Sequence, residues 1–188
     1  MPDRDVRTLQ DLIWYQYAKI IAKRALGIDA KQDHYGFIKN TLRGLQSGEK
    51  EWSDISREDW QLVEAEKQCI YCGSFDNLSR EHLVPKSLRI NDRCLTCDTI
   101  QSIHNQVWSC RSCNSQKGTM GLYVFFAQRL PSDRKFYDRI PSLADKKYLK
   151  TIYECLSKCT SLLTAMPTNG KQPDVLSLDN ALKSIGHL

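Results

Sequence analysis

Three Cys-x-x-Cys pairs crowd into residues 69–118, and they constrain the fold of this chain more than any other feature. The pairs are Cys69/Cys72, Cys94/Cys97 and Cys110/Cys113. Each such turn places two thiolates on one side of the backbone, so two turns supply the four ligands of a tetrahedral structural zinc site. In a reducing compartment this pattern favours metal binding over disulfides. Spacing alone allows any two of the three pairs to combine.

The length and composition of the chain limit its class. A chain of 188 residues that is 41% hydrophobic can bury one good core, so we expect one compact unit. No run of about 18 apolar residues is present, and the first ten residues lack the basic-then-apolar order of a signal peptide. We therefore expect a cytoplasmic protein with no membrane partner. Its net charge of +5 suits a polyanionic partner, although many proteins without such a partner are equally basic.

Apolar periodicity predicts helices on both sides of the cysteine region, so the predicted class is α+β and mostly helical. Before the region, helices are expected over residues 5–26, 32–47 and 56–67. After it, one helix is expected over 112–130 and another over 142–163, and residues 177–180 are expected to cap a last short helix. The predicted segments are a helical N-terminal extension at 1–66, a core at 67–130 and a helical C-terminal extension at 131–188.

Several side chains between and after the cysteine pairs suit phosphodiester hydrolysis. His82 can take a proton from water, since a neutral imidazole is a base near pH 7. Glu81 precedes it directly, and on a regular strand the two would point to opposite faces, so both serve one site only if the strand is bent there. Asn114 offers a carbonyl oxygen that suits a hard cation, and it is equally suited to cap a helix. Lys117 lies one turn later on the same helix face, where it could hold a phosphate oxygen.

This order of parts over residues 69–118 resembles the HNH, or ββα-metal, nucleases. In that family a β-hairpin presents a histidine, the next helix presents an asparagine or histidine, and a divalent cation between them binds the scissile phosphate. The resemblance implies a ββα-metal core at residues 67–130. It also implies that the zinc ligands are the outer four cysteines, and that the inner pair is the alternative. The outer four are Cys69, Cys72, Cys110 and Cys113, and the inner pair is Cys94 and Cys97.

The resemblance also implies roles for individual residues. His82 is expected to be the general base, and Glu81 and Asn114 are expected to bind a catalytic Mg²⁺ or Mn²⁺. The family more often has aspartate where this chain has Glu81. Asn105 is expected to tie its loop to the histidine strand by hydrogen bonds, with His104 as its rival and as a rival to His82.

The substrate implied by the resemblance is nucleic acid, with double-stranded DNA favoured. Basic side chains within the motif suggest a phosphate-backbone track: Arg80, Lys86, Arg89, Arg93 and Arg111. The alternatives are a non-catalytic, zinc-stabilised nucleic-acid-binding module and a nuclease effector subunit of a larger defence or restriction complex. The helical extensions are candidate surfaces for a protein partner or a homo-oligomer.

Overall fold

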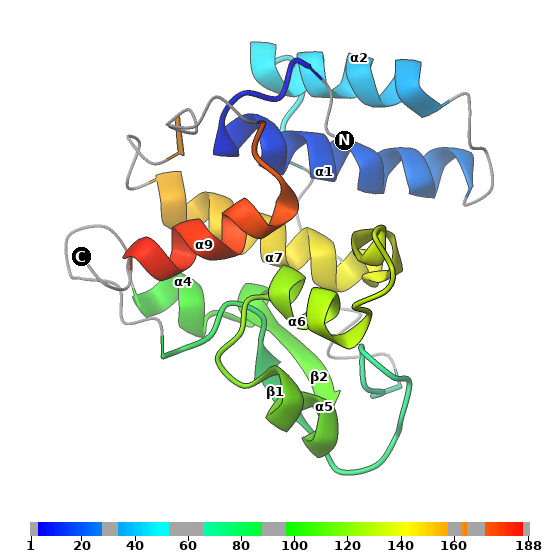
Figure 1. Cartoon of the computed structure of the whole chain (residues 1–188), viewed down its shortest axis with the longest axis vertical. Helices are drawn as coiled ribbons and strands as arrows, with labels where there is room; N and C mark the ends of the chain where they lie inside the picture. Colours follow the sequence, from blue (N-terminus) through cyan, green and yellow to red (C-terminus); the bar gives the residue numbers. More distant parts are fainter. Residues whose placement is uncertain are drawn as a thin grey trace. The chain divides into compact units, whose positions relative to one another are not determined.

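The computed structural model describes residues 4–27, 34–52, 66–87, 97–157, 163–164 and 172–185. Helices predominate, and within the described ranges the strands form one two-stranded antiparallel sheet, as the predicted class requires (Figure 1). The described elements belong to two compact units. The first contains the N-terminal helices α1 and α2, and the second contains the sheet and the remaining helices. No helix in the described part of the chain is both long and apolar enough to cross a membrane.

The first unit is a pair of helices, α1 (Leu9–Leu26) and α2 (His34–Ser47), close to the predicted ranges. A capping box fixes the start of α1: the Thr8 hydroxyl accepts from the Asp11 N–H at 3.0 Å, and the Asp11 carboxylate accepts from the Thr8 N–H at 3.0 Å. Gln46 donates to the same carboxylate at 2.8 Å, which joins the end of α2 to the start of α1. Tyr17 is buried and stacks on Trp52, so its ring serves packing.

The second unit is built on the hairpin of β1 (Leu78–His82) and β2 (Gln106–Cys110), with Arg80 opposite Trp108. Two short elements precede β2 in the connection: α4 (Cys97–Gln101) and the 3-10 helix η1 (Ile103–Asn105). Helix α5 (Arg111–Lys117) follows β2 directly and packs against both strands. Its N-cap is Cys110, whose Sγ accepts from the Cys113 N–H at 3.5 Å.

The single helix predicted over residues 112–130 is wrong, because the chain forms two helices there. Helix α5 ends at Lys117, and α6 (Leu122–Arg129) begins five residues later. Gly118 adopts a φ of +49°, which glycine tolerates and which stops the helix. The break turns α6 away from α5 and lets its apolar side chains pack separately, with Leu122, Tyr123, Phe125 and Phe126 buried.

An aspartate from the last helix caps the start of α6. Gly121, the N-cap of α6, has no side chain to accept from the first N–H groups of the helix. Asp179 of α9 (Val175–Ile185) supplies the acceptor, taking a hydrogen bond from the Val124 N–H at 2.7 Å. Its other oxygen accepts from the Tyr148 hydroxyl at 2.6 Å, and Tyr148 lies in α7 (Ser142–Ser157). Asp179 thus lies inside α9 and joins three helices, whereas the sequence predicted residues 177–180 as the cap of their own helix.

The joint around Asp179 is buried. Burial raises the pKa of Asp179 to about 6, although the hydrogen bonds from Tyr148 and Val124 favour its ionised form. Nearby, the Tyr123 hydroxyl donates to Asp145 at 2.7 Å, and its ring packs edge-on against Tyr148. The short 3-10 helix η2 (Phe136–Arg139) connects α6 to α7. These contacts hold α6, α7 and α9 as the support of the hairpin.

Replacing Gly121 with alanine should destabilise this joint. The new Cβ would collide with the Asp179 carboxylate and would lie 2.6 Å from the Tyr148 hydroxyl. We expect the free energy of unfolding to fall by about 1–3 kcal/mol, the usual range for overpacking, as measured by urea denaturation. Gly36→Ala in α2 is the control, since its Cβ would meet nothing within 4 Å and should cause no loss. Equal stability of the Gly121→Ala variant and the parent would contradict the close packing of Gly121 against Asp179 and Tyr148.

Candidate functional site

The four outer cysteines meet at one end of the hairpin. Their sulfur atoms all lie within 4.8 Å of one another, and Cys72 Sγ lies 3.7 Å from Cys110 Sγ. A tetrahedral zinc with Zn–S bonds of about 2.3 Å spaces its sulfur atoms about 3.8 Å apart. The four thiols are therefore positioned to bind a metal ion, and the geometry suits zinc.

Local backbone structure explains why these cysteines converge. Cys69 and Cys72 lie in a tight turn before β1, closed by the Gly73 N–H donating to the Cys69 carbonyl at 2.8 Å. Gly73 has a φ of +75°, which glycine adopts without strain. Cys110 ends β2 and Cys113 lies in the first turn of α5. The Ile70 N–H donates to the Trp108 carbonyl at 2.9 Å, so the turn is held beside β2.

Three of the four thiols are buried, and Cys72 is exposed. Tyr71 and Leu78 pack against this buried cluster. The Tyr71 ring meets Phe125 and Phe126 of α6 edge-on, with centroid distances of 5.2 and 6.1 Å. The turn that carries Cys69 and Cys72 is thereby attached to the aromatic side chains of α6.

Burial and hydrogen bonds shift the pKa values of two of the thiols in opposite directions. Burial raises the pKa of Cys69, but backbone hydrogen bonds from Cys110, Tyr71 and Cys72 outweigh it and lower the pKa to about 6. Burial raises the pKa of Cys113 to about 12, although a hydrogen bond from Arg129 opposes this. Arg129 Nη1 lies 3.5 Å from Cys113 Sγ, so a guanidinium from α6 faces the thiol that would carry negative charge when it binds metal.

The inner cysteine pair has no geometric test. Cys94 lies outside the described residues, and so does the side chain of Cys97, which begins α4. The role of this pair stays a prediction.

His82 is the last residue of β1 and is half-buried. Burial lowers its pKa to about 4, and the charges of Lys86 and Lys117 act in the same direction. Its Nε2 lies 3.3 Å from Gln106 Nε2. The Gln106 amide nitrogen also donates to the Gln101 carbonyl at 3.0 Å, so it must be a donor toward His82 as well. His82 Nε2 is therefore the unprotonated nitrogen of a neutral imidazole.

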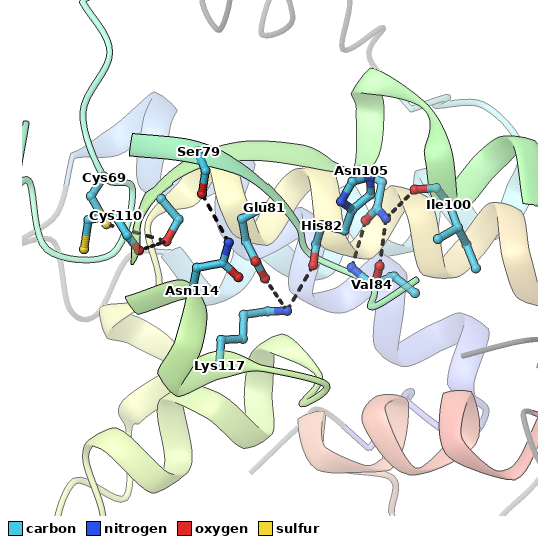
Figure 2. A network of polar contacts seen from close by, with 11 residues as sticks. Cys69, Ser79, Glu81, His82, Val84, Ile100, Asn105, Cys110, Asn114 and Lys117 are labelled. Carbon is cyan, nitrogen blue, oxygen red and sulfur yellow. Dashed lines mark hydrogen bonds and ion pairs between the residues drawn. The ribbon is translucent and has the colours of Figure 1, made fainter. Parts of the chain in front are cut away.

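Glu81 and Lys117 form a buried ion pair. Lys117 Nζ lies 2.7 Å from Glu81 Oε1 and donates to the His82 carbonyl at 3.0 Å (Figure 2). Lys117 is 0% exposed and Glu81 is 5% exposed. Burial raises the pKa of Glu81 and lowers that of Lys117, and each partner opposes the shift in the other. The ammonium expected to hold a phosphate thus lies beneath the surface and balances the carboxylate expected to hold a cation.

The hairpin separates Glu81 from His82. Glu81 and Ser79 contact α5, through Lys117 and through Asn114, whose Nδ2 donates to Ser79 Oγ at 3.3 Å. The His82 ring contacts Gln106 instead. This is the alternation of a regular strand, so the bend that would bring both side chains to one site is missing from this arrangement. Asn114 is not the cap of α5, because Cys110 holds that position.

Asn105 is fully buried and ties the strand of His82 to its loop (Figure 2). Its Nδ2 donates to the carbonyls of Val84 and Ile100 at 2.9 and 2.8 Å, and its Oδ1 accepts from the Val84 N–H at 2.8 Å. These hydrogen bonds join the residues that follow β1 to the connection that precedes β2, and the role of Asn105 in a catalytic site stays a prediction. His104, its rival, lies next to it in η1 and is half-buried.

Two residues that support the site, Lys147 and Arg129, could not be predicted from the sequence. Lys147 of α7 is 0% exposed, and its Nζ donates to the carbonyls of Ile103 and Gln106 at 3.0 and 2.9 Å. It therefore fixes the turn that carries Asn105. Lys147 and Arg129 lie on helices outside the motif, and their spacing from it carries no pattern.

Comparisons with protein-family models, with curated proteins and with solved structures return no match.

We expect one zinc ion per chain in elemental analysis. Changing Cys110 and Cys113 together to serine should remove the zinc and lower folding stability, because metal-binding free energy is folding free energy here. The matched control is the double change of Cys94 and Cys97 to serine, which should leave the zinc content at one. Zinc kept by the first variant or lost by the second would show that different turns form the site.

Proposed function

We propose that this chain is a metal-dependent endonuclease with an HNH-type ββα core, acting on phosphodiester bonds of double-stranded DNA. The observation that carries the proposal is the hairpin-and-helix unit itself. A strand ending in His82, a return strand and a helix bearing Asn114 are joined at one end by four thiols positioned for a metal ion. The order of these parts is the order that the resemblance describes.

His82 suits the role of general base. Its neutral imidazole has an unprotonated Nε2, and a water that takes the place of the Gln106 amide could give its proton to that atom. A pKa of about 4 makes the free side chain a weak base. A phosphate bound beside it would raise this pKa, because a negative charge favours the imidazolium.

Asn114 and Glu81 are the oxygen ligands proposed for a divalent cation. A Mg²⁺ or Mn²⁺ ion supplies charge neutralisation at the phosphate when bound. Asn114 uses its Nδ2 toward Ser79, which leaves Oδ1 as the atom that can bind a cation. Lys117 already pairs with Glu81 Oε1, so a cation at this carboxylate would have to displace the ammonium or bind the other oxygen.

One observation favours a second candidate, a non-catalytic zinc-stabilised module that binds nucleic acid. The buried pair of Glu81 and Lys117 is neutral as a whole and needs no cation. The module requires the four thiols and a basic surface, and it requires neither a base at His82 nor an oxygen ligand at Asn114.

Cleavage of supercoiled plasmid with Mg²⁺ or Mn²⁺ separates the two candidates. His82→Ala should lower the rate by about two to four orders of magnitude, the size of a general-base contribution, and added metal should not restore it. Asn114→Ala should also lower the rate, and raising the metal concentration should restore part of it. His104→Ala is the matched control and should cleave at the parent rate.

Circular dichroism and zinc content must be unchanged in these variants for the comparison to hold. If the parent protein nicks neither DNA nor RNA with either cation, the nuclease is rejected and the non-catalytic nucleic-acid-binding module remains. A normal rate in His82→Ala with a large loss in His104→Ala would move the base to His104.

A further inference from the structure

One surface of the hairpin gathers cations, an aromatic ring and the His82 imidazole. We call it the outer hairpin face and define it by Lys67, Arg80, His82, Gln106 and Trp108. The register pairs Arg80 with Trp108 and His82 with Gln106, and partners in an antiparallel pair project to the same side. Ser79 and Glu81 project to the other side, where α5 packs. Lys67 and Arg80 are exposed, and the other three are half-buried.

The Trp108 ring holds both cations of this face in place. Lys67 Nζ lies 4.9 Å from the ring centroid and Arg80 Cζ lies 5.7 Å from it. Both distances are within the range of cation–π attraction. Long basic side chains on a surface normally lose conformational entropy when they bind a ligand. Here the ring has already restricted them, which lowers the cost of binding an anion.

A chain of side-chain contacts connects the cations to His82. Arg80 Nη1 lies 3.5 Å from Gln106 Oε1, and the Gln106 nitrogen lies 3.3 Å from His82 Nε2. Glu81, which lies between Arg80 and His82 in the sequence, faces away and is balanced by Lys117. Glu66 precedes Lys67 and is exposed. The defined face therefore carries two positive charges and no acidic side chain.

We propose that the outer hairpin face binds the phosphodiester backbone of nucleic acid, with Lys67 and Arg80 contacting phosphates and Trp108 holding both cations in position. The inference deepens the proposed function and rests on it for the class of substrate. Cations placed around an aromatic ring suit a strand in which phosphates alternate with sugars and bases. Binding there would bring a phosphate next to His82 and not to the buried Lys117.

The test measures binding with catalysis switched off. Fluorescence anisotropy of a labelled DNA duplex in buffer with no added Mg²⁺ or Mn²⁺ and no chelator, over a series of NaCl concentrations, gives the slope of log affinity against log salt. Each lost phosphate contact reduces this slope by about 0.9. Arg80→Ala and Lys67→Ala should each produce such a reduction. Trp108→Leu should keep the slope and weaken binding about two- to fivefold, since it removes the ring and keeps both charges.

Matched controls remove equal charges elsewhere. Arg134 and Lys135 lie exposed between α6 and η2, and Arg134→Ala and Lys135→Ala should leave slope and affinity unchanged. An equal loss in these controls would overturn the proposal, because it would mean that net charge alone drives binding. Tighter binding of polyglutamate than of the duplex, with the same loss in Arg80→Ala, would also overturn it in favour of an acidic protein partner.

The outcomes separate this inference from the nuclease. If the parent protein cleaves plasmid while Arg80→Ala and Lys67→Ala keep the full slope, nucleic-acid binding on the outer hairpin face is overturned. The proposed nuclease activity is then retained. If the parent protein cleaves nothing while both variants show a reduced slope, nucleic-acid binding on the outer hairpin face is supported. The proposed nuclease activity is then rejected. Zinc content of one per chain in each variant shows that the hairpin is still folded.

Discussion

Four sulfur atoms lie within 4.8 Å of one another where three segments of the second unit meet. The turn of Cys69 and Cys72, the end of β2 and the first turn of α5 meet there. A two-stranded hairpin is marginally stable by itself in water, so it needs a further anchor. The four thiols are positioned to bind a metal ion that would supply this anchor, and Tyr71 connects their turn to the aromatic side chains of α6.

The alternation of β1 then decides what each side of the hairpin can do. Glu81 faces α5 and is neutralised by Lys117, so that side forms a closed structural contact. His82 faces the opposite side with Arg80 and Trp108, where the surface is accessible and positive. Catalysis of the proposed kind requires a cation at a carboxylate that Lys117 already neutralises, whereas nucleic-acid binding on the outer hairpin face requires no change at this pair.

Patterns within short segments were predictable, and contacts between distant segments were not. The spacing of the cysteines predicted a four-thiol site, and the resemblance selected the four thiols that meet. Apolar periodicity predicted α1 and α2 nearly to their ends. The break between α5 and α6 was missed although two glycines, Gly118 and Gly121, lie between the helices. The burial of Lys117 depends on a carboxylate 36 positions away, and Asp179 caps a helix 55 residues before it. A pattern within a short segment of sequence does not predict partners that lie so far apart in the chain.

The central claim is that a metal at the four thiols holds the hairpin and α5 in place. Amide hydrogen exchange with and without a zinc chelator tests it most directly, because exchange reports the free energy of local opening. Chelation should speed exchange in β1, β2 and α5 by at least about tenfold, while α7 and α9 keep most of their protection because their joint at Asp179 needs no metal. Unchanged exchange of the hairpin amides after zinc is removed would contradict the account.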